Sequence, residues 1–512
     1  MTARTRRRTI RRLAALAGAA TVALLATPTG ASAAPPTPGC TPTPTANPDV
    51  TDYTCYVAPI TVAGYEVKQD ILALVPKPDV DGHITKFETD VVDENLVPIP
   101  IDRLMLHHIV FSNLSKGDKT CTGAGFSSFD GYPLFGPYAP ERFAGAGEER
   151  AKLSLPPGYG YELNGAGGDY HNWALVYMLM NHRKQTDTAY IQYKLTVDTS
   201  GTLQSARPYW LDVNNCKADP IYNVPGVGKR AAKQAKKAGR NPVHKRFRDF
   251  VVQEDGWIVA GAGHVHGGAR KLTITKPSCD NKQVAVSNPT WGLANHPFYN
   301  VRPVLHEPGP IGMSGFNTPT GIPVPGGSRI RLNSFYDNKQ PHTRVMGIYV
   351  VYVAEDEPAD PPPAPCGGMP SDATFTDGTN GVAGRKTPVP FKIPLTGING
   401  AGQAVTIKGP PGRFRRLKSG AVVRVVDNEF KRPNVRLRQG ALLRYRFDSD
   451  DLHNLTLANG PMGIGSPNLD DSRIYRQRFT RPGRYRLFCA LHPVQMSQRV
   501  IVKKKRQPRK RR

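Results

Sequence analysis

Short runs that alternate apolar and polar residues dominate this chain, and they predict β-strands. Long helical periodicities are few, and Gly and Pro are frequent, with 50 and 48 residues. Strands of this kind pack as β-sandwiches. The expected strands are 103–113, 173–181 and 189–197, then 257–262, 271–275, 329–336 and 344–353, and lastly 421–426, 442–447, 455–457, 484–488 and 499–502. The pattern therefore predicts an all-β protein.

The grouping of these strands predicts three β-domains. We expect a first domain at 51–205, a second at 206–355 and a third, smaller sandwich at 370–503, with a Pro/Thr-rich linker at 34–50, a Pro-rich linker at 356–369 and a basic tail at 504–512. The Lys/Ala-rich run 229–240 predicts a surface helix or a disordered insertion. We find no repeat of solenoid or propeller period.

The first 33 residues have the features of a bacterial-type signal peptide. Arg6, Arg7, Arg8, Arg11 and Arg12 precede the apolar stretch 13–25, and Ala31-Ser32-Ala33 forms a small-residue cleavage site. The paired arginines leave a twin-arginine route open beside the general one. No later stretch reaches the roughly 20 apolar residues that a membrane span needs. We therefore expect a secreted, extracytoplasmic protein.

The net charge of +27 changes this picture little. The basic residues concentrate at the two ends of the chain and in 229–248, without a nucleic-acid-binding motif, so we expect no nucleic acid partner. Anionic envelope polymers could bind the basic tail, and lipid headgroups are an alternative. A solvated surface is the plainest interpretation.

The seven cysteines divide into two groups. Six are isolated residues that could form three disulfides, without indicating the pairing: Cys40, Cys55, Cys121, Cys216, Cys279 and Cys366. Cys489 is left over, and it begins the sequence Cys489-Ala-Leu-His492-Pro-Val-Gln-Met496 after a strand-like run. With His453 from the upstream Asp-Asp-Leu-His-Asn-Leu-Thr, this set offers one thiolate, two imidazoles and a thioether, the ligands of an electron-transfer copper site.

This C-terminal pattern resembles the cupredoxin family, which includes plastocyanin and amicyanin, over residues 370–505. The resemblance implies a Greek-key β-sandwich with a type 1 copper bound by His453, Cys489, His492 and Met496. A buried free Cys beside incidental histidines is the structural alternative, and zinc is a weaker competitor because Met is a poor zinc ligand. Phe488 and Ala490 flank the cysteine where multicopper oxidases have histidines, so a laccase-like enzyme is not expected.

Histidines in the first two-thirds of the chain fall on strand-like segments. The pair His107-His108 lies in one, His182 closes another, and His264-Val-His266 places two rings on one strand face. Adjacent histidines point oppositely on a regular strand, so His107 and His108 can share a metal only with a local distortion. Met346 precedes a Val/Tyr-rich run. Singly, each of these residues is more typical of a structural role.

In this order, the histidines and Met346 resemble the copper type II, ascorbate-dependent monooxygenases, over residues 55–355. That family includes peptidylglycine and dopamine β-monooxygenases, with two jelly-roll-like β-domains that face a solvent cleft. The resemblance implies two type 2-like coppers. His107, His108 and His182 would bind the electron-transfer copper, and His264, His266 and Met346 the catalytic copper.

Departures from that family bear on the substrate. Peptide-amidating members have an Arg where this chain has Ala262, and an Asn and a Tyr where it has Ile348 and Val350. A peptide C-terminus is thus not the expected substrate, and the pocket is expected to be more apolar. His342 is a rival ligand or second-shell partner. Structural roles are expected for three further histidines, His171, His296 and His306.

Together these features predict a secreted copper-dependent monooxygenase that uses O₂, with a fused blue-copper domain that delivers electrons. The electrons would come from an external reductant such as ascorbate or a redox protein, and the substrate is unidentified. The alternative is a non-catalytic envelope protein that binds copper or transfers electrons, since both functions need the same ligands.

Overall fold

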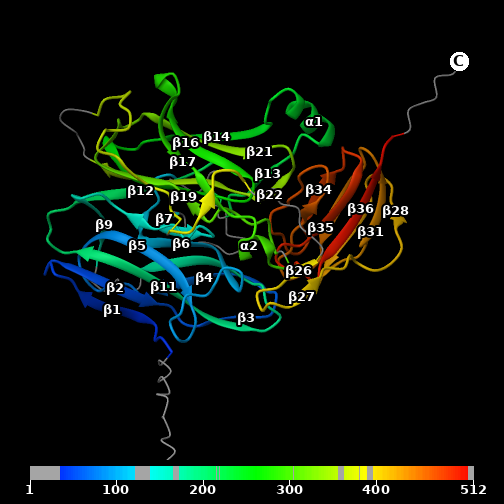
Figure 1. Ribbon diagram of the computed structural model, residues 1–512, viewed down its shortest axis with the longest axis horizontal. Helices are drawn as coiled ribbons and strands as arrows, with labels where there is room; N and C mark the ends of the chain where they lie inside the picture. The colour runs from blue at the N-terminus through cyan, green and yellow to red at the C-terminus, as the bar shows by residue number, and fades with distance from the viewer. Residues whose placement is uncertain are drawn as a thin grey trace, which may run out of the picture.

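The computed structural model describes residues 35–121, 139–164, 172–214, 216–217, 219–303, 305–355, 363–379, 381–388 and 396–505. Strands make up almost all of its regular structure, so the predicted all-β class is confirmed. Figure 1 shows layers of strands in the N-terminal two-thirds, with a separate orange and red sandwich beside them. The predicted signal peptide, His171, the first half of the 356–369 linker and most of the basic tail lie outside the described residues.

The first sandwich encloses an aromatic core. Its two faces are the sheet β4-β10-β6-β7 and the sheet section β1-β2-β11-β5-β9. Phe87 packs edge-on against Phe111, with 4.9 Å between ring centroids, and Phe143 lies 4.6 Å from Trp173. The strands and their bounds are β1 Gly39–Pro44, β2 Val50–Tyr56, β3 Ile60–Val62, β4 Val67–Val75, β5 Gly82–Val92, β6 Leu104–Gly117, β7 Pro140–Gly147, β8 Leu153–Ser154, β9 Tyr159–Leu163, β10 Trp173–Asn181 and β11 Asp187–Asp198.

The second sandwich shares a sheet with the first. β9 pairs in parallel with β12, and the sheet continues through β23, β15, β20 and β24. The sheet β14-β21-β16-β17 covers it (Figure 1). The elements are β12 Gln204–Asp212, β13 Tyr222–Val224, α1 Lys229–Lys237, β14 Val243–Val251, β15 Gly256–Val265, β16 Ala269–Lys276, η1 Pro277–Cys279, β17 Lys282–Ser287, β18 Pro289–Gly292, α2 Pro297–Asn300, β19 Gly312–Met313, β20 Gly315–Val324, β21 Arg329–Asp337, β22 His342–Val345 and β23 Gly347–Glu355. Helix α1 buries no residue, which confirms the surface-helix alternative for 229–240.

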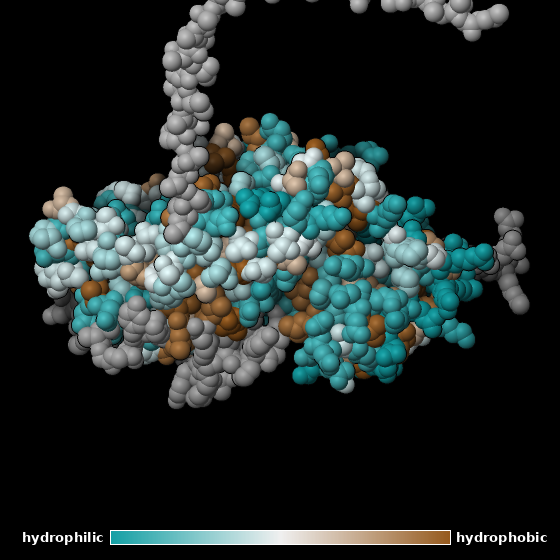
Figure 2. All heavy atoms as spheres, turned by 90° about the horizontal axis from the view of Figure 1, so that it is seen from below, coloured by the Kyte–Doolittle hydropathy of each residue, from teal (hydrophilic) through white to brown (hydrophobic). Residues whose placement is uncertain are grey.

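The C-terminal sandwich packs the sheet β28-β31-β36-β35-β33 against β30-β29-β32-β34. Alternation on β32 buries Leu443, Tyr445 and Phe447 and exposes Arg444 and Arg446, and the visible face of this unit in Figure 2 is largely hydrophilic. The strands after β23 are β24 Thr374–Thr376, β25 Gly384–Arg385, β26 Thr396–Ile398, β27 Ala404–Thr406, β28 Arg415–Arg416, β29 Val422–Val426, β30 Glu429–Phe430, β31 Asn434–Arg438, β32 Leu442–Phe447, β33 Thr456–Asn459, β34 Ile474–Arg478, β35 Gly483–Phe488 and β36 Ser497–Lys503. Strands β24 and β25 pair with β20 and β18 of the second sandwich.

Three disulfides cross-link the N-terminal two-thirds of the chain, as predicted from the six isolated cysteines. Cys40 joins Cys55 across the β1–β2 ladder, so the segment expected as a linker contains an edge strand. Such a strand tolerates its prolines because their missing N–H groups can face solvent. Cys121–Cys216 and Cys279–Cys366 complete the set. Disulfides of this kind are typical of proteins outside the cytoplasm. Among the described residues, no helix is long and apolar enough to cross a membrane.

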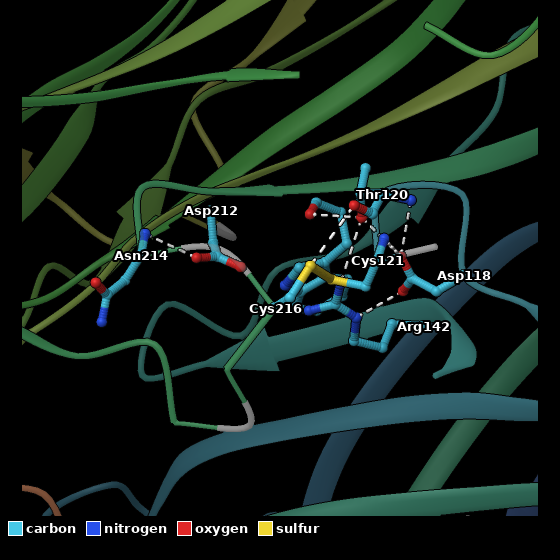
Figure 3. Close-up of a disulfide and its surroundings, with 8 residues drawn as sticks. Asp118, Thr120, Cys121, Arg142, Asp212, Asn214 and Cys216 are labelled. Carbon is cyan, nitrogen blue, oxygen red and sulfur yellow. Dashed lines mark hydrogen bonds and ion pairs between the residues drawn. A yellow bond between two sulfur atoms is a disulfide. The ribbon is translucent and has the colours of Figure 1, made fainter. Parts of the chain in front are cut away.

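The Cys121–Cys216 bridge ties the segment after β6 to the segment after β12, as Figure 3 shows. Next to it, the Asp118 carboxylate accepts a 2.7 Å bond from Arg142 Nε and further bonds from Thr120. Burial alone would raise the pKa of Asp118, but Arg142 and Thr120 more than offset it, so the pKa is lowered. The bridge therefore sits in an ordered, ion-paired corner between the two N-terminal sandwiches.

Candidate metal centres

The C-terminal ligand atoms converge at one end of the third sandwich. His453 Nδ1 lies 3.1 Å from His492 Nδ1, and the Cys489 Sγ lies 4.0 and 3.8 Å from these two atoms. Cys489 is the one free cysteine among the described residues, and it is fully buried, as is Met496. The Met496 N–H donates to His492 O, and its carbonyl accepts from Cys489 N, which closes the loop on itself. Thiolate, two imidazoles and a nearby thioether are a donor set that fits copper.

Asn454 fixes the His453 segment against the cysteine loop. Its backbone N–H points at Cys489 Sγ at 3.3 Å, and its side-chain oxygen accepts from Ala490 N at 2.8 Å. Ser449 Oγ lies 3.1 Å from His453 Nε2, which leaves the Nδ1 lone pair free for a metal. The ligands are thus held in place by hydrogen bonds within the chain itself.

Burial sets the protonation states at this site. It lowers the pKa of His453 to about 4, helped by the neighbouring His492, and it also lowers the pKa of His492. Burial raises the pKa of the Cys489 thiol, although backbone N–H groups nearby oppose it. The imidazoles are therefore neutral and able to bind a metal at neutral pH, whereas the thiol must release its proton to bind one.

A β-bulge on β6 brings the adjacent histidines of the N-terminal module together. Met178 of β10 pairs with His108 and Leu179 pairs with Leu106, so His107 is the extra residue. The bulge places His107 Nδ1 2.9 Å from His108 Nδ1. The local distortion that a shared metal requires is therefore present.

The H-x-H pair at the end of β15, in the second sandwich, lies against these histidines of the first sandwich. His264 Nε2 and His266 Nε2 are 3.2 Å apart, as expected for two rings on one strand face. The ring centroid of His266 lies 4.9 Å from that of His107. Histidines from the two sets that the family resemblance assigns to separate coppers thus lie against each other.

Three residues that sequence reasoning did not assign complete this cluster. His306 lies 4.4 Å from His107 between ring centroids, and its Nε2 contacts the Glu148 carboxylate. Glu149 accepts from His264 Nδ1 at 3.1 Å. His306 therefore belongs to the candidate site, whereas the sequence predicted only a structural role for it. The sequence could not indicate this contact, because only the fold brings the 305–309 segment next to Glu148, directly after β7. The adjacent pair Glu148-Glu149 after a strand was the available sequence signal. His296, by contrast, caps α2, as a structural histidine would.

Burial also lowers the basicity of most of these histidines. Burial and the neighbouring imidazoles hold the pKa of His107 and His266 well below the usual value and that of His108 at about 3. Burial acts in the same direction on His264, but Glu149 outweighs it and the pKa of His264 is raised. Neutral imidazoles beside two carboxylates suit a divalent metal ion.

His182, His342 and Met346 lie around this cluster. His182 is buried with its Nδ1 unpartnered, and burial with the nearby His306 lowers its pKa to about 3. Among the described residues, no hydrogen bond or ring contact joins His182 to His107 or His108. His342 Nδ1 lies 2.8 Å from Glu307 Oε1, and its Nε2 has no hydrogen-bond partner. Met346 is buried between β22 and β23, where it packs with Trp210 and Ile348.

Two cavities adjoin the histidine cluster. One of about 500 Å³ is lined by His108, His264 and Met346 together with mostly apolar side chains and a few charged ones, which are Arg142, Glu149, Lys152, Lys217 and Asp377. Ala262, Ile348 and Val350, the three departures from the peptide-amidating pattern, all line it. The second, of about 1870 Å³, has His107, His266 and His306 in its wall on one side and the C-terminal sandwich on the other.

The loop of the C-terminal sandwich from Cys489 to Met496 docks directly on the N-terminal module. Leu491, between Cys489 and His492, packs against the cores of both the second and the third sandwich. Arg344 donates to Ser466 O at 2.7 Å, and Arg481 donates to Pro225 O at 3.2 Å. Phe488, Ala490 and Leu491, which are neighbours of Cys489 in sequence, therefore line the same cavity as His107, His266 and His306.

Comparison with known proteins gives a family match for part of the chain. Residues 183–356 match the family described as "Stress up-regulated Nod 19". This segment contains His264, His266, His306 and Met346. The match is not to the copper type II monooxygenases, so that resemblance stays a prediction. No curated protein matches the chain.

Among solved structures, the chain is similar to cupredoxins over a small part of its length. An oxidised amicyanin variant is 22% identical over 16% of this chain and 82% of its own, with a TM-score of 0.16. The "Novel Purple Cupredoxin from Nitrosopumilus maritimus" is 19% identical over 16% of this chain and 99% of its own, with a TM-score of 0.15. The assignment of the C-terminal site below depends on its ligand geometry.

Proposed function

We propose that this chain is an extracytoplasmic copper oxidoreductase whose C-terminal sandwich passes single electrons to the N-terminal histidine cluster. The observation that carries the proposal is the convergence of His453 with Cys489 and His492, whose loop touches the N-terminal module through Leu491. Copper bound there would supply one-electron transfer, and copper at the N-terminal cluster would supply reactivity with O₂.

Hydrogen bonds within the chain position the residues of the C-terminal site. Ser449 orients His453, and Asn454 holds the loop that begins at Cys489. The adjoining strands, β33 and β35, pair in one sheet of the packed sandwich. Ligands held in this way change little between two oxidation states, which favours rapid electron exchange. Ascorbate or a redox protein would be the external donor, and the arginine-rich outer face together with the basic tail suits anionic envelope polymers.

The N-terminal cavity supports hydroxylation of an apolar substrate. Its 500 Å³ accept a small molecule, and Ala262, Ile348 and Val350 supply no charge to bind a carboxylate. His108, His264 and Met346 open onto the same space. In this proposal the apolar walls position a C–H bond near the ligands and exclude water, while Glu149 holds the ring of His264.

The thiolate site is tested by spectroscopy of the copper-loaded, oxidised protein. An intense visible thiolate-to-Cu(II) band is expected, and Cys489→Ser should abolish it while the far-ultraviolet circular dichroism stays unchanged. Thr456→Ser, a change on the adjoining strand that leaves all proposed ligands intact, serves as the control. Survival of the band in Cys489→Ser would show that the proposed ligand set is wrong.

One observation favours a second, non-catalytic function in copper binding or electron transfer. The histidines of the two expected copper sites are in contact, with 4.9 Å between the ring centroids of His107 and His266, rather than facing each other across a wide cleft. Consumption of O₂ by the reduced, copper-loaded protein with apolar candidate substrates separates the two functions. Substrate-dependent O₂ uptake supports hydroxylation, and its absence across such substrates supports the second function.

A further inference from the structure

We propose that His107, Glu148, His266 and His306 together hold one divalent transition-metal ion that joins the two N-terminal sandwiches. Each residue offers one ligand atom, and these atoms all lie within 4.8 Å of one another. This inference deepens the proposed function, because it adds Glu148 and His306 as ligands. It also takes one histidine from each of the two sets that the family resemblance keeps apart.

The four residues come from both sandwiches. His107 sits at the bulge of β6, and Glu148 follows β7, the neighbouring strand in the same sheet. His266 follows β15 of the second sandwich, and His306 lies in the segment between α2 and β19. An ion bound by all four would therefore fasten the first sandwich to the second at the wall of the larger cavity.

Contacts among the ligands show a site that is already assembled. Glu148 Oε1 lies 3.8 Å from His107 Nε2 and contacts His306 Nε2, while its other oxygen accepts from Gly309 N. His107, Glu148 and His266 are buried, and His306 is nearly so, with 12% of its side chain exposed. Within the described part of the chain, the Glu148 carboxylate pairs with imidazoles and a backbone N–H rather than with lysine or arginine. A buried carboxylate in such surroundings is costly unless a cation compensates it.

The ligand chemistry indicates the class of ion. Three imidazoles and one carboxylate suit a first-row divalent ion such as copper, zinc or iron, rather than calcium or magnesium, which prefer oxygen ligands. His108, His264 and Met346 remain free to serve the smaller cavity, which they line. The chain would thus still bind about three metal ions, one of them in the C-terminal sandwich.

Metal analysis of the full-length protein tests the shared site. The parent, His306→Ala and Glu148→Gln are loaded with Cu²⁺ and dialysed, and copper per chain is measured. We expect each variant to lose about one ion, and the double variant to lose no more than either single one, because both residues bind the same ion. Glu148→Gln keeps an oxygen that can accept from Gly309 N, so its fold should persist. His244→Ala and Glu162→Gln are matched controls outside the cluster.

A second pair of variants separates a shared ion from separate ones. His107→Ala combined with His266→Ala should remove about one ion if the ion is shared, and about two if each sandwich holds its own. Loss of two ions, or parent-like copper in both His306→Ala and Glu148→Gln, overturns the inference. The thiolate band should be unchanged in every variant. Its absence from the parent would instead count against the proposed function, whatever the copper content of the N-terminal module.

Discussion

Two buried methionines line the smaller cavity, and they allow a matched comparison. Met346 lies beside His264 in that lining, whereas Met313 belongs to the core of the second sandwich and also reaches the cavity wall. Met346→Ile and Met313→Ile both roughly conserve volume, so each should cost less than about 1.5 kcal/mol of stability. If the Met346 thioether binds Cu(I), only Met346→Ile should lose the infrared band of carbon monoxide bound to the reduced protein.

A parent-like carbon monoxide band in Met346→Ile would make Met346 a core residue only. His342, whose Nε2 is buried and unpartnered, would then be the next ligand to test by the same measurement. Loss of the band in both variants would point to a general effect of repacking the cavity wall rather than to a ligand.

The protonation of His182 predicts how the metal-free protein responds to acid. Burial, aided by His306, lowers its pKa from 6.5 to about 3 in the folded chain. Below pH 6.5 the unfolded chain takes up a proton that the folded chain does not, so stability is complete above that pH and falls as the pH falls toward the folded pKa. His182→Gln should reduce the slope of unfolding free energy near pH 5 by about 1.4 kcal/mol per pH unit.

Urea denaturation of the chelator-treated protein at several pH values measures that slope. His244→Gln is the control, because His244 is only half-buried and its pKa is less displaced. Equal slopes in the parent and in His182→Gln would contradict the burial argument.

The sequence predicted which C-terminal site residues lie together, but not which residues of the histidine cluster do. The proximity of the C-terminal candidate ligands was predictable because three of the four lie within one eight-residue loop, whose short reach keeps them together. Glu148 and His306 were not, because 158 residues separate them and only the packing of two sandwiches brings them into contact. Their spacing in sequence carries no sign of that contact.

At the scale of elements, the bulge of β6 changes which positions of the strand carry buried apolar residues. Leu104 and Leu106 face the first core, and after the bulge Ile109 and Phe111 do so. This switch from even to odd positions leaves both His107 and His108 on the opposite face, toward the second sandwich. The switch is present in the sequence, but it becomes convincing only when β10 shows the register. Strands such as β24, with three exposed residues, have no apolar pattern to predict them.

The disulfide between β6 and β12 should stabilise the protein more than the one in the β1–β2 ladder. Cys121 and Cys216 are 95 residues apart, whereas Cys40 and Cys55 are 15 apart. Because a disulfide reduces the conformational entropy of the unfolded chain, the one that closes the longer loop should be more stabilising by about 1.5 kcal/mol. A single disulfide typically contributes about 2–4 kcal/mol. Replacing each pair with alanines and measuring unfolding free energy by denaturant titration tests this order. An equal or reversed order would show that the ion-paired corner around Arg142, rather than the cross-link, holds the two segments together.

At the scale of the whole molecule, the relation between the histidine cluster and the C-terminal site could not be derived from sequence. Hydrophobic patterning indicates which face of a strand is buried, but not which sandwich covers it. Leu491 is an example, because its apolar side chain in the copper-ligand loop was expected and its contact with the second core was not. That contact gives the electron flow predicted from the fused domains a direct connection between the C-terminal loop and the second sandwich.

Two arginines of the C-terminal sandwich allow that electron flow to be tested without altering any proposed ligand. Arg481 donates to Pro225 O and Gly226 O across the interface, whereas Arg478 donates to Gly440 O within its own sandwich. Arg481→Gln should therefore weaken docking of the copper-ligand loop, and Arg478→Gln should not. Electron transfer between the two parts depends on their contact, so docking should control its rate.

The measurement is a stopped-flow experiment in which the fully reduced, copper-loaded protein is mixed with O₂ and the returning thiolate band is followed. If the C-terminal copper is reoxidised through the histidine cluster, the band should return several-fold more slowly in Arg481→Gln than in the parent and in Arg478→Gln. Equal rates in all three proteins, with the same copper content, would mean that electrons leave the C-terminal site directly to solvent. In that case the contact through Leu491 would be structural, and the two metal centres would work independently.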